Sequence, residues 1–161
     1  MNQSPLRLER YALLAIRLEP APNAEPAENS YHVDFDKADF TATVNFSPVH
    51  LPNGEPRFAI DLTLEAKPKA DVAGFPYSFF LQMVGFFDGQ QLPEATRHKL
   101  VVVNGASMLY SAARDMLVGL SLRSVFGTVL LPSVSFAYLA DQVSQPAQQA
   151  GDNTEATSQD S

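Results

Sequence analysis

The chain has 161 residues, 45% of them hydrophobic, a formal net charge of -7 at pH 7 and no cysteine. This length suits one domain with a proper core. The acidic balance disfavours nucleic acid as a partner, and the lack of cysteine excludes disulfides and thiolate metal sites. The amino terminus lacks the apolar run of a signal peptide, and no window holds the roughly 18 apolar residues of a membrane span. We therefore expect a cytoplasmic protein that does not insert into a membrane.

Four segments with strand-like patterns come first in the chain. Residues 6–18, 40–46 and 58–66 alternate apolar and polar side chains, which predicts strands with one buried face. Residues 77–88 are apolar on both faces, so this strand needs a cover on both sides. A helix could supply one cover and a second subunit the other. The turn signals between the segments, strongest at residues 52–56 (PNGEP), predict a meander.

Helical signals follow the strands. Pro93 predicts the start of a short helix that runs to Lys99, and the Asn104-Gly105 pair predicts a break before a longer helix. The longer helix has an apolar stripe with three- and four-residue spacing. The stripe consists of Leu109, Ala112, Ala113, Met116, Leu117 and Leu120. A last helix is expected at about residues 136–144.

Strands grouped first and helices last indicate an α+β domain. We expect residues 1–144 to form this domain. Residues 145–161 are rich in Gln, Ala, Ser and Asp and lack large apolar side chains. They are expected to be a disordered acidic tail.

The residue types needed for catalysis do not converge in the sequence. His32, His50 and His98 are widely separated, and no nucleophile elbow or phosphate-binding glycine loop is present. Arg114-Asp115 is the most tempting polar pair, but a solvated helix face or an ion pair between helices explains it more simply. We therefore expect that the protein is not an enzyme and that it binds neither a metal nor a cofactor.

The stretch from Val125 to Phe136 favours binding over chemistry. It contains no charge, and Gly127 and Pro132 exclude a regular helix, so apolar side chains stand on irregular backbone. Loops are normally polar, and an apolar loop needs a partner to cover it. A subunit interface or an open groove is as good an explanation as a core for five phenylalanines. They are Phe79, Phe80, Phe86, Phe126 and Phe136.

Residues 104–139 resemble the SecB export-chaperone family. The similar features are the Ala113-Arg114-Asp115 triplet on the long helix and the apolar residues that lead through the loop into the last helix. Residues 10–19, which lead into Pro22-Asn23, and Gly85 followed by two aromatic residues are also similar. The likeness covers nearly the whole chain in order and length.

The resemblance implies a four-stranded antiparallel sheet with the helices on one side, assembled as a homotetramer that is a dimer of dimers. Unfolded or precursor polypeptides would bind in apolar grooves and stay competent for export. By position, the candidate client-binding residues are Phe126, Val129, Leu131, Val134, Phe136, Val44 and Phe46. The expected oligomer interface comprises Phe79, Leu81, Met83, Met116 and Leu120.

The resemblance also implies contact with the SecA translocase motor through acidic residues on the sheet. Glu19 falls at one such position, but Ala15 and Phe80 replace two expected acids, which weakens capture of a basic partner. A holdase for unfolded chains is the first hypothesis. The alternative is a SecB-like adaptor dedicated to one partner, such as an antitoxin, without delivery to SecA.

Overall fold

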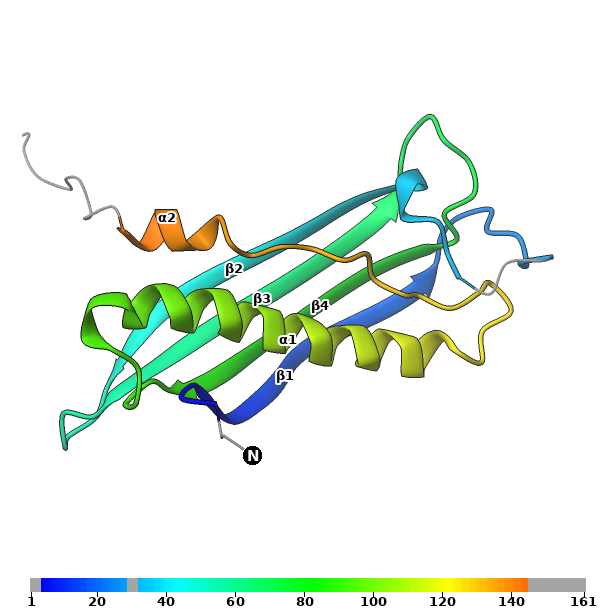
Figure 1. Cartoon of the computed structure of the whole chain (residues 1–161). Helices are drawn as coiled ribbons and strands as arrows, with labels where there is room; N and C mark the ends of the chain where they lie inside the picture. The colour runs from blue at the N-terminus through cyan, green and yellow to red at the C-terminus, as the bar shows by residue number, and fades with distance from the viewer. Residues whose placement is uncertain (1–3, 29–31, 145–161) are drawn as a thin grey trace, which may run out of the picture.

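The computed structural model describes residues 4–28 and 32–144 and has the expected α+β fold (Figure 1). One antiparallel sheet contains four long strands: β1 (Arg7–Pro20), β2 (Ala38–His50), β3 (Pro56–Pro68) and β4 (Tyr77–Asp88). The period-two pattern predicts all four, and β4 has the predicted bounds. The predicted tail, residues 145–161, lies outside the described residues.

The strand order across the sheet is β1-β4-β3-β2. β2, β3 and β4 follow one another through short connections, but β1 lies beside β4 and is joined to β2 by residues 21–37, which include the short 3-10 helix η1 (Phe35–Lys37). The predicted meander is therefore wrong for β1, and the order is that of a Greek key. Alternation reveals which face of a strand is buried, but not which strand it pairs with. β1 and β2 are the two edges of the sheet.

The helix α1 (Arg97–Ser121) is uninterrupted and follows the 3-10 turn η2 (Glu94–Thr96). The predicted break at Asn104-Gly105 is wrong. Gly105 packs closely on the sheet, where an added Cβ would lie 2.4 Å from Ile60 Cδ1 and 3.1 Å from Phe87 Cζ. The glycine permits close packing of helix on sheet instead of turning the chain.

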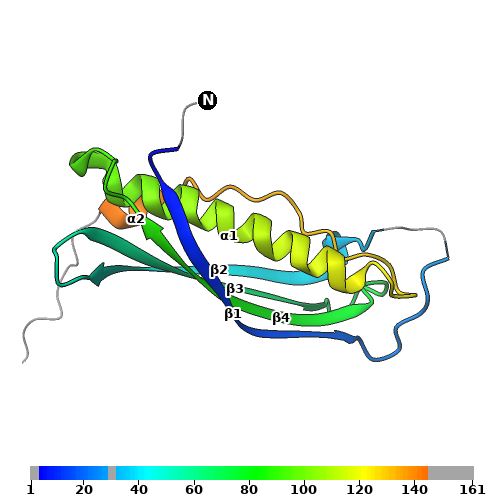
Figure 2. The same ribbon diagram turned by 90° about the horizontal axis from the view of Figure 1, so that it is seen from below.

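All helical elements lie on one face of the sheet, which we call the inner face (Figure 2). α1 crosses β3 and β4, and the chain then returns along α1 as an extended segment, residues 122–138, which we call the strap. A short helix, α2 (Leu139–Ser144), ends the described chain close to the predicted position. Among the described residues, no helix covers the opposite, outer face of the sheet.

The core lies between α1, the strap and the inner face of β3 and β4. Its members from the sheet include Phe58, Ile60, Leu62, Leu64, Tyr77, Phe79, Leu81, Met83 and Phe87. Phe79, Leu81 and Met83 are at most 3% exposed within the single chain, where Phe79 packs against the rings of Phe35 and Phe40. The prediction that these three form an oligomer interface is therefore wrong.

Candidate functional site

The strap is fixed to the end of α1 by a buried hydroxyl group. Ser121 Oγ donates to the carbonyl oxygen of Leu117 at 2.7 Å and accepts from the backbone N–H of Val129 at 2.7 Å. Ser121 and Val129 are both 0% exposed. The serine thus satisfies a backbone donor that buried irregular chain would otherwise leave unpaired.

Two tyrosines hold the strap further along. The hydroxyl of Tyr110 on α1 donates to the carbonyl oxygen of Pro132 at 2.7 Å, and that of Tyr77 on β4 donates to the carbonyl oxygen of Gly127 at 2.6 Å. The Tyr110 ring also packs edge-on against Phe136, with ring centroids 5.6 Å apart. Burial raises the pKa of Tyr110 to about 12, although the charge of Arg114 opposes the shift. The apolar loop is therefore covered largely by its own chain.

Three predicted client-binding residues of the strap are core residues. Val129, Leu131 and Phe136 are 0%, 1% and 3% exposed. The prediction that they line an open groove is wrong, since their side chains attach the strap to α1 and the sheet. Phe126 is half-buried and packs edge-on against the Tyr77 ring, with centroids 6.2 Å apart.

Other predicted contact residues remain accessible. Val134 is 39% exposed in the second half of the strap, and Tyr138 is 49% exposed at its end. On the inner face of β2, Val44 and Phe46 belong to a half-buried row with Phe40 and Ala42. The strap runs between α1 and β2 (Figure 1), so this row and the outer side of the strap border the same part of the molecule.

A second apolar surface lies between β1 and α1. Tyr11 and Leu13 pair with Gly85 and Met83 of β4, which places their side chains on the inner face. They are nevertheless 48% and 41% exposed. Strict alternation puts Tyr11 and Leu13 on the same side as Arg7 and Glu9, but the register shifts between Leu8 and Arg10 and between Leu13 and Ala15 place them on the inner face.

The flank of α1 that faces β1 completes this surface. Tyr110 and Ser121 lie on the flank of α1 that contacts the strap. The opposite flank of α1, whose residues follow one another every four positions, therefore faces β1. That flank consists of Met108, Ala112, Met116 and Leu120. Leu120 is 53% exposed and Met116 is half-buried, so these two predicted interface residues are accessible.

The outer face of the sheet brings together the residues related to SecA contact. Ala15 and Glu19 pair with Gln82 and Ser78 of β4, which places both on this face. Phe80, which pairs with Arg17, lies on the same face. The Glu19 carboxylate lies 4.0 Å from Arg17 Nε, and both side chains are well exposed. A neighbouring arginine therefore offsets the one remaining acid.

An ion network joins β1 to the rest of the sheet. The Arg57 guanidinium forms 3.0 Å contacts with the carboxylates of Glu9, Glu55 and Asp88, and only 16% of the Arg57 side chain is exposed. Asp88 also accepts from the backbone N–H of Gln90 at 2.8 Å. Every charge in the network has a partner, which indicates a structural role.

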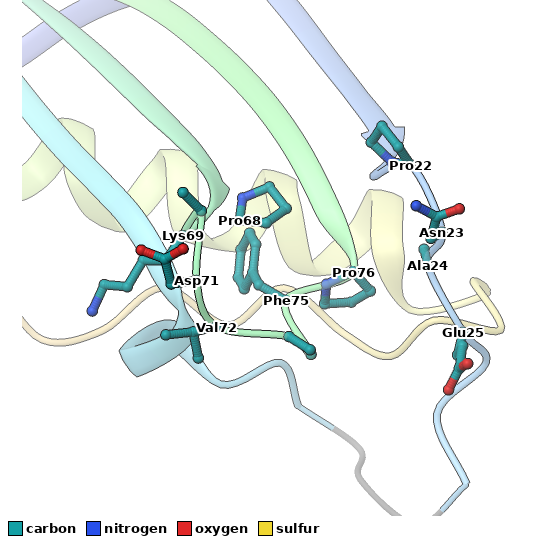
Figure 3. Close-up of a pocket in the computed structure, with 13 residues that line it drawn as sticks. Pro22, Asn23, Ala24, Glu25, Pro68, Lys69, Asp71, Val72, Phe75 and Pro76 are labelled. Atoms are coloured by element: carbon teal, nitrogen blue, oxygen red, sulfur yellow. The ribbon is translucent and has the colours of Figure 1, made fainter.

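A pocket of about 680 Å³ opens between residues 22–25 and the β3–β4 loop (Figure 3). Its walls are mainly prolines, alanines, Val72 and Phe75, with charges from Glu25, Asp71 and Lys69. Lys69 Nζ donates to the carbonyl oxygen of Asp36 at 2.7 Å. The pocket offers no paired acid and base for proton transfer.

Residues typical of metal or acid–base sites are dispersed. No group of three His, Cys, Asp or Glu side chains with metal-binding geometry occurs within residues 4–28 and 32–144. His98 packs edge-on against Phe46 and Phe58, with centroids 5.7 and 5.4 Å away. Over the same residues, no helix has the length and apolarity of a membrane span.

Comparison with solved structures gives distant likenesses, which include the following two proteins. A SecB-like chaperone of Mycobacterium tuberculosis, solved with a peptide from an antitoxin, is 13% identical over 81% of this chain and 91% of that chain, with a TM-score of 0.48. A Streptococcus agalactiae protein of unknown function is 16% identical over 80% of this chain and 97% of that one, with a TM-score of 0.44. No family model and no curated protein matches the chain. At these identities and TM-scores, the likenesses establish neither a family nor a function.

Proposed function

We propose that this protein is a chaperone that holds unfolded polypeptide segments on apolar surfaces, without a catalytic step. The proposal rests on one observation. Large apolar side chains on the inner-face side of the sheet are exposed and lie outside the buried core. They include Leu13, Leu120, Val134 and Tyr138. An unfolded chain gains about 25 cal/mol for each Å² of apolar surface that it buries there.

The two apolar surfaces suit two different tasks. The strap and the inner row of β2 border an uncharged region that can accept an extended client. The surface between β1 and α1 combines Tyr11, Leu13, Met116 and Leu120, and we assign it to self-association as a homotetramer. Several client sites in one assembly would raise the affinity for a long client through effective concentration.

Calorimetric titration with one protein in two forms tests the proposal. Reduced and carboxymethylated α-lactalbumin stays unfolded, whereas native α-lactalbumin is folded. We expect tight binding of the unfolded form alone. Equal binding of both forms, or of neither, would contradict a general holdase and favour an adaptor dedicated to one partner.

A matched pair of valine substitutions tests where the client binds. Val134→Asp places a charge on the strap and is expected to weaken binding of the unfolded form about tenfold, because the charge must lose water on contact. Val72→Asp makes the same change at a side chain with similar exposure, 41% against 39%, in the β3–β4 loop. It should leave the affinity unchanged.

Delivery of clients to SecA stays a prediction from the sequence resemblance alone. Glu19 is the candidate contact, and Arg17 lies beside it.

A further inference from the structure

The two edges of the sheet differ in how they are protected. β1 carries Arg7, Glu9, Arg10, Arg17 and Glu19, and its register with β4 shifts twice, between Leu8 and Arg10 and between Leu13 and Ala15. Charged side chains and β-bulges of this kind hinder another strand from pairing with an edge strand. β1 is therefore a protected edge.

β2 lacks these devices along most of its length. From Phe40 to Ser47 the strand reads FTATVNFS, without charge, proline or glycine, and its register with β3 is regular from end to end. Among the described residues, no strand pairs with its other side. A long, uncharged edge without bulges is a template for one more strand.

The hydrogen bonds fix which backbone groups of β2 are available. The carbonyl oxygen of Pro56 accepts from Gly89 beyond the end of β4, so Pro56 directs its backbone away from its partner on β2, His50. Backbone direction alternates along a strand, so even-numbered residues of β2 direct their N–H and C=O groups outward. The carbonyl of Lys37, an odd-numbered residue, accepts from Lys69 on the β3 side, which agrees with this alternation. Pro48, which has no N–H, occupies an even position, as expected for proline on an edge strand.

The same even-numbered residues carry the apolar row of the inner face. Phe40, Ala42, Val44 and Phe46 are half-buried, whereas their odd-numbered neighbours are exposed and polar. A strand added to this edge would place alternate side chains beside the apolar row. Its other side chains would lie on the outer face.

The charges of that outer face define the partner further. On the two strands nearest this edge, Asp39 of β2 and Asp61 and Glu65 of β3 stand with one base at the same levels, Lys67. Arg17, the other base at these levels, lies on β1 at the far edge of the sheet. Side chains on the outer face of an added strand would therefore be favoured if they were basic or neutral.

We propose that the edge of β2 binds an extended client segment as a fifth strand, with apolar residues alternating with basic or neutral ones. The inference rests on the proposed holding function and gives its binding mode. Main-chain hydrogen bonds would supply affinity without regard to sequence, and the apolar row would select the alternating pattern.

Amide hydrogen exchange on the full-length protein tests this directly. Without client, the outward amides of Phe40, Ala42, Val44 and Phe46 should exchange faster than the inward amides of Thr41, Thr43 and Asn45. Saturation with carboxymethylated α-lactalbumin should slow the outward set at least about tenfold and change the inward set little. If the client binds tightly and the outward amides exchange as before, the edge is not the binding site, although the holding function stands. If the client does not bind, the holding function itself fails.

A proline substitution provides a second, independent test. Ala42→Pro removes one outward N–H and keeps the bonds to β3, since Pro48 already occupies a position of the same kind. We expect at least about a tenfold loss of client affinity. Ala70→Pro is the matched control, because Ala70 follows Lys69 in a turn closed by the Val72 N–H to Lys69 carbonyl contact, a position that favours proline. Unchanged affinity in a folded Ala42→Pro variant would overturn the proposal.

Peptides that alternate valine with lysine or with glutamate test the charge preference. The lysine peptide should bind more tightly, and the difference should shrink as salt is added. A preference for the glutamate peptide would contradict the assignment of the outer row.

Discussion

Ser121 is a small polar side chain on which the attachment of the strap depends. Ser121→Ala would leave the Val129 N–H buried without an acceptor, and we expect the free energy of unfolding to fall by about 1–3 kcal/mol. Urea denaturation measures this loss. Ser111→Ala removes a similar hydroxyl, which donates to the Ser107 carbonyl on the exposed side of α1, and it should change stability by less than about 0.5 kcal/mol. Equal effects of the two substitutions would contradict the role of Ser121.

Tyr110 should make stability depend on pH in alkaline solution. Its pKa is about 12 in the folded chain and about 10 in an unfolded one, so the unfolded state loses its proton first. The stabilisation is complete below pH 10 and is lost as pH rises toward 12. Thermal denaturation across this range should show a steeper fall for the wild type than for Tyr110→Phe. Parallel curves would show that Tyr110 does not titrate as described.

The sequence identifies the apolar strap but not what covers it. Val129, Leu131 and Phe136 have the same side chains whether they face a client or the chain's own helix. The deciding contacts come from Ser121, Tyr110 and Tyr77, which lie on elements separate from the strap and whose hydroxyl groups bond its backbone. Such non-local hydrogen bonds leave no periodic signal.

At the scale of elements, α1 owes its fit on the sheet to Gly105. Gly105→Ala would force Ile60 and Phe87, both in the core, to move, and we expect a net loss of about 1–2 kcal/mol despite the better helix propensity of alanine. Gly119→Ala meets nothing within 4 Å and should gain up to about 1 kcal/mol. Chemical denaturation of the two variants compares them. A stabilised Gly105→Ala variant would mean that the packing is looser than described.

Gly105 also shows which features a local sequence pattern predicts and which it does not. Alternation predicts every strand, because each buries one face and period two is a local property. An Asn-Gly pair also has a local meaning, which is a turn. In α1 no turn forms, because the glycine is needed for close packing against the side chain of Ile60 on β3.

For the whole molecule, the surface between β1 and α1 should determine the oligomeric state. We expect a native mass of four chains for the wild type, and a smaller one for Leu13→Glu and Leu120→Glu, because each buries a charge at the subunit contact. Leu100→Glu changes a leucine that is 37% exposed near the start of α1 and should keep the wild-type mass. Light scattering after size exclusion measures all four proteins. A wild-type mass of one chain would refute the assembly.

The strand order delays the pairing of β1 while the chain is being synthesised. β1 ends at Pro20, but its partner β4 begins only at Tyr77. At ~5–20 residues per second, the ribosome needs several seconds to make the intervening stretch. During that interval the apolar residues of β1 have no strand to pair with. Each nascent copy is thus, for a short time, the kind of unfolded segment that finished copies are proposed to hold.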